Sequence, residues 1–485
     1  MDDRRDRIIA YAFLVIFVLT HVPYLLTPIT GSHRLRQADT AAVARNFAVE
    51  SPNILYPRVD RRGETSGITG MEFPLYQYVA SIIHRITGSL HDGWGKLLSL
   101  VSALGVFLLL GSLLCRFFGI ERRYSYAALF FVPAFFLFAG KYMPSITGLL
   151  FGVGGMYATL QYHDDPKARH LVIAAMCLAC AALIRPFLIF FCLPLLVIFI
   201  YSLAFQRRFR FGVLLTGVSI IIPFVAWYYL WAPHLVRSYG LNIFFFGYSL
   251  SQTLAEMASV GLWIEFFKTV FQYYTGYALI PVAIAGIVGF RRGLRANSPD
   301  QDETAHRPLP GYLAHTVVWI IPLATALTLF VIIGRHFSPH YYYFFAFIPS
   351  AAILIAYGLR NAHELMRNYY YALLVVLGAI FFIAIGYTYR VDDDVKSLVR
   401  LQPLVAEKTA PFDRVVIINT GTPPLYLHLV RRHGWTLFEN ELADPKTIRE
   451  LTERGARWVI TRENDTFALY AIDEWLSRIS RKTAK

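Results

Sequence analysis

Two carboxylates in one polar stretch of the chain are placed to do acid–base chemistry. The first, Asp39, lies near the start of a run from Gln37 to Phe47 whose small alanines predict a helix. A carboxylate in the first turn of a helix is stabilised by the helix dipole, so Asp39 has a purely structural interpretation. The alternative is a general base that takes a proton from a substrate hydroxyl.

The second carboxylate, Glu72, lies in an apolar and aromatic segment and precedes Pro74, which is predicted to begin a helix. A carboxylate in such surroundings needs a partner, because an unpaired buried charge costs free energy. The same stretch is rich in cations: Arg34, Arg36, Arg45, Arg58, Arg61 and Arg62. Two interpretations remain open: a salt-bridge network resting on lipid headgroups, or a site where carboxylates handle a hydroxyl and arginines hold a phosphate.

A third polar group follows much later, between residues 334 and 343. Tyrosines such as Tyr341 are typical of a membrane interface, but Arg335 with His336 and His340 exceeds what anchoring requires. The two histidines have i,i+4 spacing, yet no acidic third ligand lies nearby, so no metal site is predicted. Arg185 stands between two apolar runs, where a cation favours an anionic ligand. We therefore predict that Arg185 and Arg335 hold phosphate, and that His336, His340 and Tyr341 contact substrate.

The elements that position these residues are membrane helices. Of the 485 residues, 56% are hydrophobic and only 16% are charged, and the apolar residues form runs long enough to cross a bilayer. This composition excludes a soluble enzyme and a disordered chain. We predict a polytopic α-helical membrane protein with eleven spans, at 8–26, 94–114, 124–140, 143–162, 168–184, 186–205, 211–232, 271–290, 315–333, 340–359 and 369–389.

The net charge of +14 has a topological explanation. With a cytoplasmic N-terminus, the short loops on the cytoplasmic side carry most of the Lys and Arg, as the positive-inside rule requires. No nucleic-acid partner is therefore predicted. The expected location is the inner (plasma) membrane, multi-pass, with the first loop (27–93) and the C-terminal domain on the extracytoplasmic side.

Beyond the membrane part (1–390), residues 391–485 are predicted to form a small α/β extracytoplasmic domain. Strands are expected at 413–419, 435–438 and 458–461, and an amphipathic last helix at 467–479. The run 392–394, three aspartates, is expected to be a solvated exit from the last span. Neither a GxGxxG motif nor a P-loop is present, so nucleotide binding is not predicted.

The paired motifs of the first loop resemble the GT-C superfamily of glycosyltransferases. The likeness is to glycosyltransferase family 39, which includes protein O-mannosyltransferases and lipid A aminoarabinose transferases, and within it to a bacterial branch. It covers about residues 1–390. It rests on Arg36-Gln37-Ala38-Asp39-Thr40 with Ala44-Arg45-Asn46-Phe47, on Glu72-Phe73-Pro74-Leu75-Tyr76-Gln77-Tyr78, and on His340-Tyr341-Tyr342.

This resemblance implies a GT-C fold and transfer of a sugar from a polyprenyl-phosphate carrier on the extracytoplasmic face, with no cofactor. It implies that Asp39 activates the acceptor and that Glu72 is the second acidic position. The chain departs from the aminoarabinose transferases at Phe73, where they have Lys, and in the spacing of Arg45.

The combined prediction is an inverting transfer to an acceptor hydroxyl. Asp39 is the base, and Arg185, Arg335, Arg36 and Arg45 hold the donor phosphate. The sugar and the acceptor, whether glycan, lipid or protein, are not predicted. Membrane lipids are the other expected partners, and no metal is expected. A lipid-linked glycan polymerase or ligase, or a membrane transporter, is the alternative.

Overall fold

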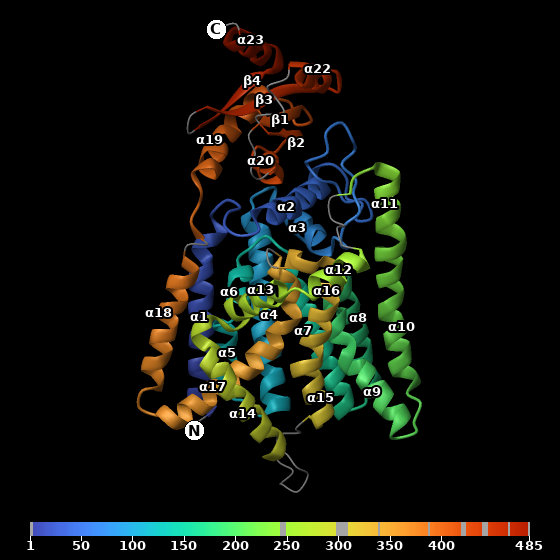
Figure 1. The fold of residues 1–485 in the computed structure, drawn as a ribbon, viewed down its shortest axis with the longest axis vertical. Helices are drawn as coiled ribbons and strands as arrows, with labels where there is room; N and C mark the ends of the chain where they lie inside the picture. The colour runs from blue at the N-terminus through green and yellow to red at the C-terminus, as the bar shows by residue number, and fades with distance from the viewer. Residues whose placement is uncertain are drawn as a thin grey trace.

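A bundle of membrane-spanning helices carries two layers at one end: the helices of the first loop, and above them an α/β domain (Figure 1). The computed structural model describes residues 3–242, 249–296, 309–337, 340–386, 389–418, 423–438, 445–463 and 466–483. The N-terminal helix starts at the far end of the bundle, and the C-terminal helix lies on the outer face of the α/β domain (Figure 1).

Seven helices in the described part of the chain are long and apolar enough to cross a membrane: Arg4–Leu25, Gly93–Phe118, Pro186–Ala204, Phe211–Tyr239, Tyr277–Leu294, Gly311–Ile333 and Tyr341–Met366. Two shorter apolar helices, Ala168–Ile184 and Tyr370–Gly386, accompany them. Together they correspond to nine of the predicted ranges, and the polytopic helical fold is confirmed.

The remaining two predicted spans are not among these nine helices. The range 124–140 is two short buried helices, α5 (Arg122–Phe130) and α6 (Pro133–Ala139), because Pro133 has no backbone N–H to continue the ladder. The range 143–162 corresponds to α7 (Ser145–Asp164), which packs against α8 in the interior of the bundle. A Cβ added at Gly155 would lie 2.5 Å from Leu178, so glycine permits this close packing.

The other elements of the bundle include several 3-10 and π turns, which interrupt the long spans. In chain order they are α1 (Asp3–Leu25), α4 (Gly93–Phe118), α8 (Ala168–Ile184), η1 (Pro186–Cys192), α9 (Leu193–Ala204), α10 (Phe211–Val225), η2 (Ala226–Trp231), α11 (Ala232–Tyr239), α12 (Leu250–Met257), α13 (Val260–Val270), η3 (Phe271–Thr275), η4 (Tyr277–Leu279), α14 (Ile280–Ala296), α15 (Gly311–His315), η5 (Thr316–Ile320), α16 (Ile321–Ile333), η6 (Gly334–Phe337), η7 (Tyr341–Phe347), α17 (Ile348–Met366) and α18 (Tyr370–Gly386).

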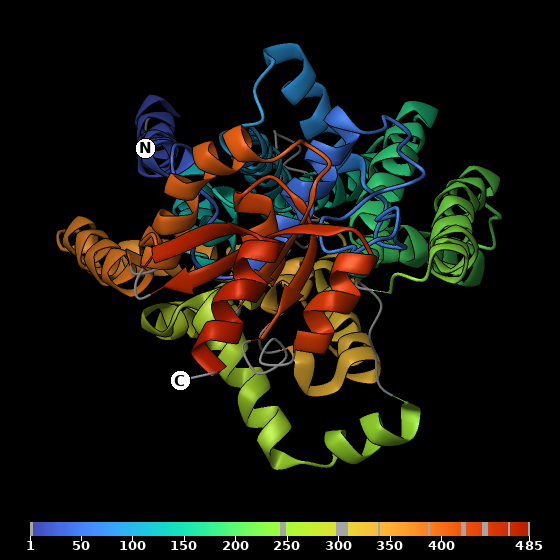
Figure 2. The same ribbon diagram turned by 90° about the horizontal axis from the view of Figure 1, so that it is seen from above.

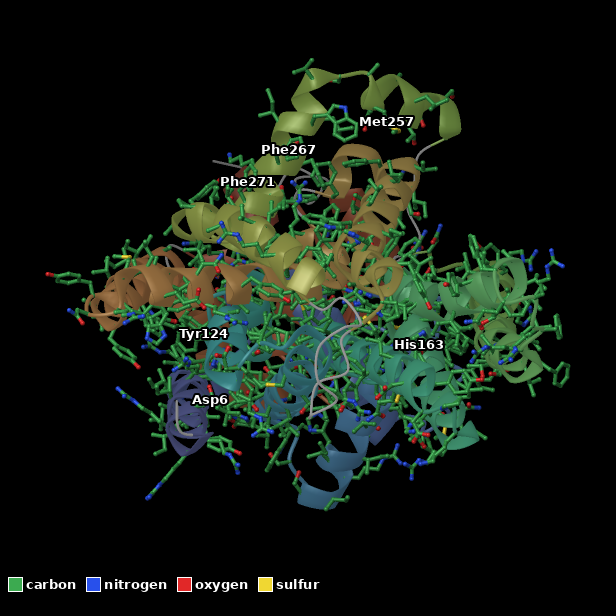
Figure 3. The ribbon with its side chains drawn as sticks, turned by 90° about the horizontal axis from the view of Figure 1, so that it is seen from below. Asp6, Tyr124, His163, Met257, Phe267 and Phe271 are labelled. Atoms are coloured by element: carbon green, nitrogen blue, oxygen red, sulfur yellow. The ribbon has the colours of Figure 1, made fainter. Side chains whose placement is uncertain are left out.

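Polar contacts hold the end of the bundle that is remote from the α/β domain (Figure 3). Asp6 of α1 accepts a hydrogen bond from the backbone N–H of Arg123, in the first turn of α5 (3.2 Å). The hydroxyl of Tyr124 lies 2.5 Å from a ring nitrogen of His363 on α17, and His163 of α7 lies 3.0 Å from the hydroxyl of Tyr312 on α15. The same view shows Met257 and Phe267 on α12 and α13, which project from the side of the bundle (Figure 3).

The first loop contributes two helices, α2 (Arg34–Val49) and α3 (Leu75–Thr87), which lie between the bundle and the α/β domain (Figure 1). Because α2 begins at Arg34 and not at Gln37, Asp39 falls in its second turn. The interpretation of Asp39 as a first-turn residue is therefore wrong. The middle of α2 is buried on all sides, against α3 below and the α/β domain above.

The C-terminal domain is a four-stranded sheet in the order β2-β1-β3-β4, seen from above in Figure 2. Its strands are β1 (Arg414–Ile418), β2 (His433–Leu437), β3 (Ala456–Glu463) and β4 (Thr466–Ala471), and its helices are α19 (Asp393–Lys408), α20 (Pro423–Leu429), α22 (Pro445–Glu453) and α23 (Ile472–Thr483). The first three strands pair in parallel, and β4 is antiparallel to β3. The small α/β domain is confirmed.

The predicted last helix at 467–479 is wrong in its first part. Residues 466–471 form β4, which pairs with β3 from Thr466↔Glu463 to Ala471↔Trp458, and the helix starts only at Ile472. Pairing with β3 gives the backbone groups of residues 466–471 their hydrogen-bond partners. The aspartate run is also not simply solvated: Asp392 pairs with Arg34, and Asp394 accepts a hydrogen bond from Tyr426 (2.6 Å).

The first loop is joined to the edge of this sheet. The N–H of Gly63 donates to the carbonyl of Gly434 (2.9 Å), and the N–H of Gly434 donates to the carbonyl of Asp60 (3.1 Å). Gly434 has φ +148°, and a Cβ there would lie 2.1 Å from the carbonyl oxygen of Val415. Glycine is therefore required where the loop extends the sheet beside β2.

Candidate active site

A cavity of about 540 Å³ lies where the first loop meets the membrane-spanning helices. Residues from α2, the segment before α3, η1, α10, η2, α16 and η7 enclose it. Its polar lining residues are Arg36, Asp39, Glu72, Arg185, Thr328 and His340, and its aromatic lining residues are Phe187, Phe190, Phe224, Tyr228, Tyr229, Tyr342 and Tyr343. The cavity therefore combines a few charged groups with a mostly apolar wall, as small-molecule sites do.

Asp39 is the unpaired carboxylate of this cavity. Its exposed fraction is 7%, and within the described residues its carboxylate makes no hydrogen bond and no ion pair. Burial raises the pKa of Asp39 to about 7, against the opposing charges of Arg36 and Arg61. A carboxylate with a pKa near neutrality can take up a proton efficiently at physiological pH.

Glu72 is held in the opposite electrostatic state. Both of its carboxylate oxygens accept hydrogen bonds from Arg36, and Nη1 of Arg185 lies 3.8 Å from its Oε1. Burial alone would raise the pKa of Glu72, but Arg36 and Arg185 outweigh burial and lower it. Glu72 is therefore charged and engaged, whereas Asp39 is free to exchange a proton.

Backbone contacts on both sides fix the position of Glu72. The N–H of Phe73 donates to the carbonyl of Leu183 at the end of α8 (3.1 Å), and the indole of Trp227 donates to the carbonyl of Met71 (2.8 Å). Phe73, which differs from the Lys of the aminoarabinose transferases, packs edge-on against Trp227 with ring centroids 4.9 Å apart. These anchors bring the loop carboxylate to the membrane helix that carries Arg185.

Arg185 is a buried cation with donors to spare. It ends α8 in an extended conformation, and its guanidinium lies over the ring of Tyr342, 5.0 Å from the centroid. Within the described residues, its Nε and Nη2 are buried without a hydrogen-bond partner. Unsatisfied buried donors of a cation are costly, so an anionic ligand in the cavity would relieve that cost.

Only some of the other residues predicted to contact substrate or phosphate lie at this cavity. His340 lines the cavity, 3.0 Å from the hydroxyl of Tyr342, but Tyr341 does not, because its ring stacks on Tyr273 with centroids 3.6 Å apart. Arg45 is likewise away from the cavity, inside the loop, where it pairs with Asp60 (2.5 Å). The positions of Tyr341 and Arg45 give no support to a substrate or phosphate contact.

Arg335 and His336 fall on η6, and their side chains lie outside the part of the chain that the structure describes. Among the described residues, no group of three or more His, Cys, Asp or Glu is arranged to hold a metal ion.

The aromatic wall of the cavity was not predicted. Tyr228 belongs to the π turn η2, and its hydroxyl donates to the carbonyl of Leu183 (2.7 Å), two residues before Arg185. Aromatic residues near span ends are common in membrane proteins, so their type alone gives no signal. Their convergence on Arg185 depends on the 3-10 and π turns η1, η2 and η7.

No family model matches the chain, and no curated protein matches it. Solved structures do. ArnT from Cupriavidus metallidurans bound to undecaprenyl phosphate is 13% identical, with a TM-score of 0.57 over 96% of this chain and 99% of that chain. The Archaeoglobus fulgidus oligosaccharyltransferase is 13% identical, with a TM-score of 0.56 over 93% of this chain and 67% of that chain.

The arabinofuranosyltransferase AftD from Mycobacteria is also 13% identical, with a TM-score of 0.54 over 96% of this chain and 35% of that chain. At this identity the likeness establishes the fold, and membership of glycosyltransferase family 39 stays a prediction. The chain therefore has the fold of the GT-C superfamily of membrane glycosyltransferases.

Proposed function

We propose that the chain is an integral-membrane glycosyltransferase that moves a sugar from a polyprenyl-phosphate donor to an acceptor hydroxyl. The observation that carries this proposal is the cavity that combines an unpaired, buried Asp39 with the donors of Arg185 and an aromatic wall. The resemblance in fold to an ArnT structure bound to undecaprenyl phosphate supports a lipid-linked donor.

The lining of the cavity suits such a donor. Phe187, Phe190 and Phe224 supply apolar surface for a sugar and the first isoprene units, and Arg185 supplies unpartnered donors for the phosphate. Arg36 lies at the same cavity but is engaged by Glu72, so Arg185 is the principal phosphate ligand of the proposal.

The proposed reaction assigns a role to each of these groups. The acceptor oxygen attacks the anomeric carbon and loses its proton to Asp39 as the bond between that carbon and the phosphate oxygen breaks, with inversion. The electron pair of the broken bond stays on polyprenyl phosphate, whose developing charge faces Arg185. Glu72 acts as a positioning residue, because it holds Arg36 and faces Arg185.

The proposed orientation places the cavity and the α/β domain on the extracytoplasmic side of the plasma membrane, and the N-terminus in the cytoplasm. Basic residues at the remote end of the bundle support it, including Arg116 at the end of α4 and Arg122 and Arg123 at the start of α5.

Transfer with purified components tests the proposal. The full chain in lipid nanodiscs is incubated with polyprenyl-phosphate sugars and a panel of envelope glycans and lipids, and products are detected by mass spectrometry. Asp39→Asn should reduce the rate by roughly 100-fold or more, since it removes the base. Asp164→Asn, which loses a carboxylate paired with Arg116 (2.5 Å) at the remote end, is the control and should keep the wild-type rate. Wild-type transfer by the Asp39 variant would refute the assignment.

A further inference from the structure

A second cavity, of about 480 Å³, lies between the first loop and the α/β domain. It opens at the edge of the sheet where the parallel strands β1, β2 and β3 begin. Its charged and titratable lining residues come from both sides: Glu50, Arg58 and Arg62 from the loop, with Arg414, His433 and Arg457 among those from the domain. It is separate from the cavity that contains Asp39, and the proposed reaction does not use it.

The loop side of this basic cleft holds more positive than negative charge. Glu50 is shared by two arginines, with Oε2 3.2 Å from Arg58 and Oε1 2.8 Å from Arg62. Arg62 has an exposed fraction of 6%, and within the described residues its Nε is buried without a hydrogen-bond partner, as is the Nε of Arg58. One carboxylate thus serves two guanidinium groups, that of the buried Arg62 and that of Arg58, whose side chain is 29% exposed, and within the described residues each keeps a buried Nε donor without a partner.

The domain side adds two more cations. Arg414 donates to two backbone carbonyls, those of Arg454 (2.9 Å) and Glu64 (3.3 Å). Arg457 lies 3.3 Å from Asp413, and its side chain has an exposed fraction of 73%. Asp413 also accepts hydrogen bonds from a backbone N–H and an indole, so it is already engaged. Burial, followed by the charge of Arg62, lowers the pKa of His433 to about 4, so this imidazole is neutral and can also donate.

We propose that the basic cleft binds a phosphate or carboxylate group on a glycan acceptor, and so selects an anionic glycan for the transfer reaction. This inference rests on the proposed function. Helix α2 connects the two cavities, since Asp39 lies on it and Glu50 caps its end. Eleven residues of helix span about 16 Å, so the anionic group is held well away from the reacting hydroxyl.

The separation in turn requires an acceptor of several sugar units. The rest of the lining fits a glycan better than an apolar peptide, because Thr65 and Ser66 offer hydroxyls and Phe412, 64% exposed, offers an aromatic face at the rim. The cleft at the sheet edge thereby binds the charged group of the acceptor, and sugar transfer takes place at the cavity that contains Asp39.

Binding without turnover tests the inference. The full chain in nanodiscs, carrying Asp39→Asn to prevent reaction, is titrated with four probes: an oligogalacturonate, a phosphorylated oligogalactan, a neutral oligogalactan and an oligoglutamate. One of the two anionic glycans should bind more tightly than the neutral one, and its affinity should fall with salt. The comparison of these two probes decides between carboxylate and phosphate.

Substitutions place the binding at the cleft. Arg457→Glu and Arg414→Gln should each weaken the preferred anionic probe by about tenfold or more, because each removes a charge-assisted hydrogen bond. Arg478→Gln, which removes an exposed arginine of the same domain paired with Glu463 (2.8 Å), should bind as the parent does. Since Arg457 is mostly exposed, loss of folding does not explain its effect; thermal unfolding verifies this.

Three results would overturn the inference. They are unchanged affinity in both cleft variants, equal affinity for neutral and anionic glycans, and tighter binding of the oligoglutamate than of any glycan. These readouts do not depend on catalysis, so absence of transfer by the wild-type protein would refute the proposed function alone. Transfer that proceeds normally while the cleft variants bind normally would refute the inference alone.

Discussion

Removing the charge of Asp39 should make the fold more stable while ending its activity. The carboxylate is buried and, within the described residues, has no hydrogen-bond partner, so its ionised form pays for desolvation without compensation. An amide of the same size at this position carries no charge. Asp39→Asn therefore removes a cost to the stability of the folded state, and the proposed role of Asp39 as the base explains why the carboxylate is present.

The magnitude follows from the pKa. Burial raises the pKa of Asp39 from 3.8 to about 7, and each unit corresponds to about 1.4 kcal/mol, which gives about 4 kcal/mol. Because the folded pKa is the higher one, the folded state binds more protons between these values. The free energy of unfolding of the wild type therefore falls by this amount as the pH rises from about 4 to 7, and the contribution of Asp39 is constant above that range. Asp39→Asn lacks this loss.

Thermal unfolding of both proteins in nanodiscs, between pH 4.5 and 8.5, measures the effect. The variant should exceed the wild type in apparent unfolding temperature by several degrees at pH 8 and by much less at pH 4.5. Asp60→Asn is the contrasting buried carboxylate: its pairing with Arg45 is lost, so it should lower stability. A difference between Asp39→Asn and wild type that does not change with pH, or a less stable variant at pH 8, would refute the reasoning.

Four further outcomes are expected. The kcat/KM of the wild type should rise about tenfold per pH unit up to an apparent pKa near 7 and then level off, because the base must be ionised; a flat profile between pH 5.5 and 8.5 would contradict this. Glu72→Gln should lower the free energy of unfolding by roughly 3 to 5 kcal/mol at pH 7, and the loss should shrink as the pH falls below 4.5, the reverse of the Asp39 effect, since the pKa of Glu72 is lowered from that value; thermal unfolding across this pH range checks it, and a loss that does not change with pH would contradict it. Arg185→Gln should raise the KM for the polyprenyl-phosphate sugar about tenfold, and an unchanged KM would exclude it as the phosphate ligand. Gly434→Ala should lower the unfolding temperature, as its Cβ would lie 2.1 Å from a carbonyl oxygen, and calorimetry would detect the loss.

The sequence was sufficient for the elements with a strong periodic or apolar signal. Nine predicted spans, three strands and the helix with Asp39 correspond to elements of the structure. Strand β4 was not predicted, because residues 466–471 pair with β3 and this pairing outweighed the helical pattern of their sequence.

The cavity could be predicted only in part. Arg36 and Asp39 are three residues apart and so share a face of α2, which a helical wheel reveals. Arg45 is nine residues from Arg36, two and a half turns, and so faces the other way, toward Asp60; the same wheel would have excluded it. The approach of Arg185 to Glu72 had no such signal, because it depends on the contact of Phe73 with the end of α8.

The contacts between the first loop and the α/β domain also affect how the protein folds during its synthesis. Arg34 pairs with Asp392 and Asp92 with His428, contacts that join residues 358 and 336 positions apart. The loop that carries Asp39 is made before the α/β domain that covers it. During synthesis the loop therefore stays uncovered until the helices of that domain have been made. A chain interrupted before Asp392 lacks the surface that buries the helix with Asp39.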